Sequence, residues 1–118
     1  MGDALLPARQ GKTPYFDSAL VATEVSVKTS RARLYGWHVY NPNSTDAYIQ
    51  FFDALAANVT PGTTAPDFVL WVPALGGVDE EGDDKGVHFA NGLTVIATTT
   101  STGSTAPTTG LMVNLLYS

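Results

Sequence analysis

Two stretches decide the fold of this chain: residues 31–40, RARLYGWHVY, and residues 47–55, AYIQFFDAL. Their aromatic and branched residues predict β-strands, but apolar side chains fall on both faces of each strand. In the first stretch, for example, Leu34 and Trp37 stand at positions of opposite parity. A strand of a simple antiparallel sandwich alternates apolar with polar residues. The pattern therefore predicts a second cover, formed by another layer, an arm of the chain or a neighbouring subunit.

Shorter segments indicate further strands, separated by stretches rich in Gly, Pro, Asn and Thr. These segments are residues 20–29, 68–72, 86–89, 93–100 and 110–117, and residues 74–85 read as a loop. Turn residues at 41–44 predict a hairpin between the two opening stretches, and Asn91 with Gly92 predicts a second hairpin. We therefore expect an all-β fold, an antiparallel β-sandwich or jelly roll of about seven to eight strands.

The first residues of the chain carry no strand or helix period and are interrupted by Pro7, Gly11 and Pro14. Only contacts with another surface would hold such a segment in place. We expect residues 1–17 to form an extended N-terminal arm and residues 18–118 to form the sandwich domain. The expected arm or subunit contacts are Leu5, Leu6, Tyr15, Phe16, Tyr35, Trp37 and Trp71. The expected core residues are Val21, Val25, Val27, Leu93, Val95, Val113 and Leu115.

Composition excludes several classes of function. The net charge of −5 and the pI of 4.6 argue against nucleic-acid binding, which requires Lys and Arg to displace counterions. The absence of cysteine excludes disulfides and thiolate metal sites. No run approaches the ~18 apolar residues of a membrane span, and residues 1–10 lack the features of a signal peptide. We expect a protein that contacts neither nucleic acid nor membrane.

An acidic stretch at residues 79–84 contains five of the eleven acids. Asp79, Glu81 and Asp83 are candidate oxygen ligands for Ca²⁺. Their spacing does not match the calcium-loop pattern, so a solvated loop tip is the favoured interpretation, with a contact to a basic partner surface as a third.

Catalytic constellations are not visible in the sequence. His38 and His88 fall in expected strands and are read as ordinary strand histidines. Asp53 and Asp67 are a conceivable carboxylate pair for glycoside cleavage, but nothing selects them over other acids. The glycosylation patterns at Asn43 and Asn58 are read as chance matches. We expect no enzymatic activity and no cofactor. The clustered aromatics predict core and interface positions rather than a sugar-binding platform.

The string LYGWHVYNPN at residues 34–43, followed by AYIQFFD at 47–53, resembles a pattern in short structural proteins of tailed bacteriophages. A later GVHFANGL at residues 86–93, leading into ATTT at 97–100, fits the same pattern, as does Tyr117. The resemblance spans roughly residues 34–100, and its motifs are mostly turn and core positions. The acidic stretch 79–84 is not part of it.

The resemblance implies a β-rich virion component made in the bacterial host cytoplasm and located on the capsid surface. A capsid decoration (cement) protein that bridges subunits of the major capsid protein is the first expectation, with a homotrimer as the implied assembly. A tail or baseplate structural protein is an alternative. A carbohydrate-binding module on a virion fibre is an alternative of a different class.

Overall fold

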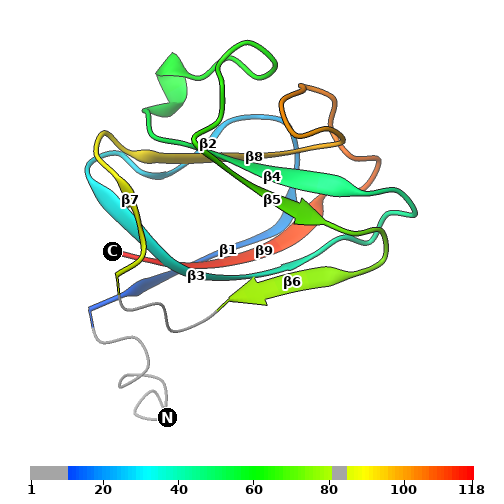
Figure 1. Ribbon diagram of the computed structural model, residues 1–118, viewed down its shortest axis with the longest axis horizontal. Helices are drawn as coiled ribbons and strands as arrows, with labels where there is room; N and C mark the ends of the chain where they lie inside the picture. Colours follow the sequence, from blue (N-terminus) through cyan, green and yellow to red (C-terminus); the bar gives the residue numbers. More distant parts are fainter. Residues whose placement is uncertain (1–10, 81–84) are drawn as a thin grey trace.

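The computed structural model describes residues 11–80 and 85–118, whose strands form two stacked antiparallel sheets (Figure 1). Sheet A has the order β1-β9-β3-β6, with β7 also paired to β3, and sheet B has the order β2-β8-β4-β5. The strands of sheet A are β1 (Thr13–Leu20), β3 (Ala32–Tyr40), β6 (Gly77–Glu80), β7 (Val87–Phe89) and β9 (Leu111–Tyr117). The strands of sheet B are β2 (Val25–Lys28), β4 (Ala47–Phe52), β5 (Phe68–Val72) and β8 (Leu93–Thr98), and a short 3-10 helix η2 (Ala56–Asn58) follows β4. The expected β-sandwich is confirmed.

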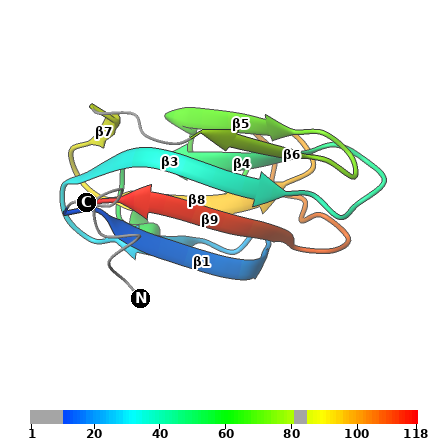
Figure 2. The ribbon, with the colours of Figure 1, turned by 90° about the horizontal axis from the view of Figure 1, so that it is seen from below.

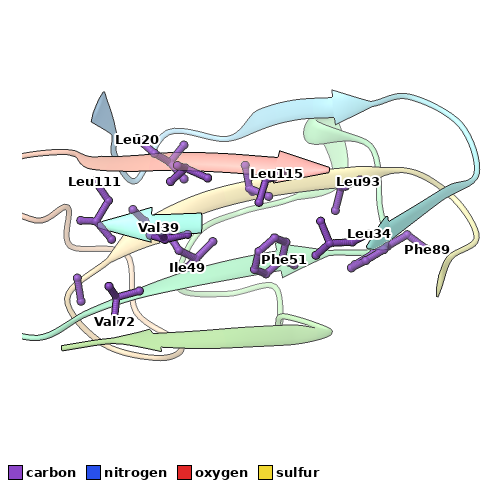
Figure 3. Packing of buried hydrophobic residues seen from close by; sticks show 14 of the residues in the cluster. Leu20, Leu34, Val39, Ile49, Phe51, Val72, Phe89, Leu93, Leu111 and Leu115 are labelled. Atoms are coloured by element: carbon purple, nitrogen blue, oxygen red, sulfur yellow. The ribbon is translucent and has the colours of Figure 1, made fainter. Parts of the chain in front are cut away.

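A single apolar cluster fills the space between the sheets (Figure 3). Leu93, Val95, Val113 and Leu115 are buried in it as expected, and Val25 and Val27 pack against its edge. The expectation for Val21 is wrong, because 38% of this residue is exposed. A strand was expected over residues 20–29, but β1 ends at Leu20 and β2 begins only at Val25, so Val21 lies in the connection between two sheets.

Both expected hairpins are wrong. β3 lies in sheet A and β4 in sheet B, and likewise β7 pairs with β3 while β8 lies in sheet B. The turns at residues 41–46 and 90–92 therefore carry the chain from one sheet to the other. A turn residue signals a change of chain direction, and the packing of the two sheets decides whether the flanking strands pair. Two strands were also unforeseen: β1 includes part of the expected arm, and β6 lies in the expected loop 74–85.

The apparent second apolar face of β3 comes from a β-bulge. The register with β9 shifts between Leu34 and Gly36, so that Tyr35 is an extra residue and the parity of the strand reverses. Leu34 before the bulge and Trp37 after it therefore both face the core, where Trp37 packs on Phe68 with ring centroids 5.5 Å apart. The other face of β3 is consequently more polar than the sequence pattern indicated.

On β4 both faces are buried, as the sequence predicted, and the second cover is the chain itself. Phe52 and Ile96 form a small outer cluster with Val59, which lies just after η2. Gln50 is fully buried, and its Nε2 donates to Thr98 Oγ1 (2.7 Å) and to the carbonyl of Gly103 (3.1 Å). The connections 53–67 and 99–110 thus close the outer face of sheet B, above β4 and β8 in Figure 1.

A buried asparagine pair fixes the end of the sandwich where β3 passes into β4. Asn41 Nδ2 donates to the carbonyls of Thr45 (2.9 Å) and Val72 (3.2 Å), and its Oδ1 accepts from the backbone N–H of Asn43 (2.9 Å). Asn43 in turn exchanges two hydrogen bonds of 2.8 Å with the backbone of Thr109. The Asn43 amide is therefore engaged inside the fold, and this glycosylation pattern is not open to modification in the folded chain.

We expect Asn41→Ala to lower the free energy of unfolding by about 2–4 kcal/mol, because several hydrogen bonds are lost and buried carbonyls are left without a donor. Urea unfolding followed by tryptophan fluorescence measures this change. Asn58→Ala is the matched control: Asn58 is exposed, and its substitution should change stability by less than about 0.5 kcal/mol. Equal effects of the two substitutions would contradict the assigned role of Asn41.

Candidate functional site

The two sheets differ in how their outer faces are covered. Loops of the chain close the outer face of sheet B, whereas no segment within residues 11–80 and 85–118 covers the outer face of sheet A (Figure 1). Figure 2 looks onto this second face, with β1, β9 and β3 side by side toward the viewer. The uncovered face of sheet A is therefore the surface on which a functional contact can form.

Strand register arranges the side chains of this surface in three rows, because Val39 and Val113 point into the core and their neighbours point outward. We call this surface the open face. The first row holds Pro14, Leu116 and Gly36, the second Phe16, Asn114, His38 and Asp79, and the third Met112, Tyr40 and Gly77.

Apolar groups dominate the open face on the side of β1 and β9. Phe16 is 59% exposed on the edge strand β1, and Tyr40 is 40% exposed on β3. Met112 and Leu116 on β9 are half-buried between them. Exposed aromatic and methionine side chains beside apolar neighbours are typical of the centres of protein–protein contacts.

A hollow of about 270 Å³ lies within the open face, where Gly36 has no side chain to fill the first row. Pro14, Leu116 and Asn114 border it toward β1 and β9, and Asp79 and Glu80 of β6 give it an acidic rim.

His38 also lines the hollow, with Nδ1 3.8 Å from Asp79 Oδ2. Both side chains are about two-thirds exposed, so this contact adds little to stability and stays accessible to a partner. The hollow thus combines a neutral, largely apolar side with a charged one.

The structure separates the residues expected to make contacts. Phe16 lies on the open face, whereas Tyr15 and Trp37 point into the core from β1 and β3. Tyr35 lies in the bulge, with Lys12 Nζ 4.4 Å from its ring centroid. Leu5 and Leu6 lie outside the described residues. The assignment of these residues to an interface stays a prediction, and Phe16 is the residue whose position fits it best.

Trp71 lies apart from this group, on the outer side of edge strand β5 in sheet B, and is 55% exposed. Its Nε1 donates to Asp46 Oδ2 (3.1 Å), and the other oxygen of Asp46 accepts from the backbone N–H of Ala74 (3.0 Å). The indole is therefore held in one orientation while much of its surface faces solvent.

The calcium hypothesis is not supported by the described part of the chain. Asp79 lies in strand β6 beside His38 rather than at a loop tip, and Glu81 and Asp83 lie outside the described residues. Among residues 11–80 and 85–118, no three His, Asp or Glu side chains group closely enough to hold a metal ion.

Asp53 and Asp67 do lie close together, but both serve the backbone. Asp67 Oδ2 accepts from the backbone N–H of Asp53 (2.7 Å), and Asp53 Oδ1 accepts from that of Asn91 (2.7 Å). These bonds tie the end of β4 to the start of β5 and to the turn before β8. Of the histidines, His88 is exposed on β7 opposite Arg33.

Sequence reasoning did not single out Pro14, Gly36, Met112 and Leu116. Two pieces of information were missing: the pairing of β9 with β1 and β3, and the bulge at Tyr35, which turns Gly36 away from the core. In the part of the chain that the structure describes, no helix is long and apolar enough to cross a membrane.

Comparisons with known proteins identify no family for this chain. No protein-family model matches the chain, and no curated protein matches its sequence. Among solved structures, the fold is similar to that of the tobacco streak virus coat protein, with a TM-score of 0.42 and 9% identity over 90% of this chain and 83% of that one. A likeness of this size carries no argument about function, which therefore has to come from the open face.

The hydroxyl of Tyr15 gives the fold a dependence on alkaline pH. Its partial burial and the neighbouring Asp17 carboxylate, 3.4 Å away, raise the pKa of Tyr15 to about 12. The unfolded chain loses this proton near pH 10. The stabilisation is therefore complete below pH 10 and is lost as the pH rises toward 12. We expect the free energy of unfolding to fall between these values, and Tyr15→Phe to flatten the fall.

Proposed function

We propose that this chain is a non-enzymatic virion structural protein, and that it serves as a capsid decoration protein on the head of a tailed phage. The observation that carries the proposal is the contrast between the two sheets. The chain uses its own loops to cover the middle strands β4 and β8 of sheet B, yet its described residues leave Phe16 and Tyr40 exposed on sheet A. An apolar face of this kind fits contact with neighbouring proteins. The phage-like sequence pattern supports a virion as the setting.

The mechanism would be physical rather than chemical. Apolar area removed from water contributes roughly 25 cal/mol per Å², so a protein that bridges capsid subunits adds stability at each junction. Such bridges would help the shell to resist the pressure of the packaged genome. The partners are the major capsid protein and further copies of this chain. The family resemblance implies that the copies form a closed assembly such as a trimer.

Co-sedimentation with empty phage heads that lack the protein tests this function. Tyr40→Glu places a charge on the open face and should weaken binding by about tenfold or more, because an unpaired charge is costly to bury. Leu55→Glu is the matched control, since Leu55 is 39% exposed but lies on the loop outside sheet B. Equal binding by both variants would argue that the open face does not meet the capsid.

The same assay tests the N-terminal arm. Deletion of residues 1–10 is preferable to deletion of residues 1–16, because β1 begins at Thr13 and the longer deletion removes half of an edge strand. Loss of binding on the shorter deletion supports an arm contact through Leu5 and Leu6. Unchanged binding contradicts it. A tail or baseplate protein would use the same face, and binding to tails in place of heads would identify that alternative.

A carbohydrate-binding role is the second candidate, and the exposed, fixed indole of Trp71 favours it. Tyr48 is directly opposite Trp71 across the β4–β5 pairing and is half-buried, so two aromatic residues are cross-strand neighbours on the outer side of sheet B. If sugars bind here, Trp71→Ala should abolish retardation of the protein in polysaccharide-containing gels and leave head binding unchanged. The absence of retardation in the unsubstituted protein, tested over cell-wall and capsular polysaccharides, would reject the sugar-binding role.

A further inference from the structure

Phe16 is the most exposed large hydrophobic side chain of the open face. It projects from edge strand β1 with 59% of its surface in solvent, opposite Asn114 of β9. It does not line the hollow at Gly36, although Pro14, two residues earlier, does. The open face thus carries a projecting aromatic ring and, beside it, a hollow of about 270 Å³ that the described residues leave unfilled.

The ring and the hollow match each other in chemistry. Pro14, Leu116 and the bare backbone of Gly36 offer an apolar seat, while Asn114 and His38 border it with polar groups. Aromatic rings seated in desolvated pockets are the usual anchors of protein interfaces. Because both features belong to one face, two copies placed face to face can exchange them.

The extents of the molecule leave room for a stable contact between copies on this side. Seen as in Figure 2 the whole molecule measures 39 × 19 Å, so a standard interface, to which each partner contributes ~800 Å², would use most of this side. If two copies each place Phe16 in the hollow of the other, they form a two-fold dimer. If each copy places Phe16 in the hollow of the next, the copies form a closed ring such as a trimer.

We propose that the open face binds a second copy of this chain, with Phe16 of one copy seated in the hollow at Gly36 of the next. This inference rests on the proposed function, because it identifies one partner of the same surface. It applies to a dimer and to a closed trimer alike, since both place the same residues in contact.

Cysteine cross-linking tests the contact directly, because the chain has no cysteine of its own. Full-length F16C and H38C, one of them carrying a size tag, are mixed at about 100 μM and oxidised; the high concentration offsets the weaker contact of F16C, which lacks the ring. A contact between copies brings residue 16 of one within disulfide reach of the hollow of the other, and we expect a mixed disulfide. W71C mixed with H38C is the matched control, since Trp71 is 55% exposed on the other sheet. The yield of its mixed disulfide should be lower by a factor of about ten or more. Equal yields overturn the proposal.

Sedimentation equilibrium between about 1 and 100 μM gives the second measurement, the dissociation constant of the oligomer. Interfaces of this size range from micromolar to picomolar affinity, and these concentrations cover the weak end of that range. We expect an oligomer whose dissociation constant rises about tenfold or more with Phe16→Ala, and equally with Asn114→Trp, which fills the hollow and leaves Phe16 in place. Trp71→Ala should leave it unchanged. A monomer at all concentrations overturns the inference, as does an oligomer that resists both substitutions or one that dissociates only on deletion of residues 1–10.

The two proposals fail in different ways. A protein that stays monomeric but sediments with phage heads would overturn the contact between copies and leave the decoration function standing. An oligomer that loses its contacts as described but binds no virion component would overturn the decoration function and support the inference.

Discussion

Strands β4 and β8 form the middle of sheet B and bury the side chains of both their faces, so the covering of their outer face is the constraint on which the structure depends. Core side chains of sheet A cover the inner face of β4 and β8. The chain covers the other with two long connections, held by the outer cluster around Phe52 and by the buried amide of Gln50. Without that cover, Phe52 and Ile96 would face water at a cost of roughly 1.5–3 kcal/mol each, which is a large part of the stability of a domain of this size.

The two long connections of the described chain, residues 53–67 and 99–110, both lie over sheet B. Within the described residues, no loop crosses the outer side of β9 and β3, and the side chains there mix apolar and polar groups. The bulge at Tyr35 adds to this asymmetry by turning Trp37 inward and leaving Gly36 and His38 outside. The middle of sheet B is therefore covered by the chain itself, whereas sheet A presents a surface with a projecting ring and a hollow.

This asymmetry connects the fold to the proposed function. A protein that acts by assembly needs one surface that stays accessible in the folded monomer and a body rigid enough to hold it in shape. The Asn41 and Asn43 network ties the turn after β3 to β5 and to the segment before β9. The strands that carry the open face are thus held at their ends by buried hydrogen bonds, which favours a preformed contact surface.

The sequence alone determined the all-β class, the two-sided burial of residues 47–55 and most core positions, because side-chain alternation is a property of each strand by itself. It did not determine strand pairing, since the turns at residues 41–46 and 90–92 change sheets where hairpins were expected. Nor did it show the open face. A single extra residue, Tyr35, reverses the parity of β3. The covers of sheet B come from Val59, just after η2, and from Gly103, which is 53 residues from Gln50 in the chain. Only the tertiary structure brings these residues together, and so only it decided which sheet the described residues leave uncovered.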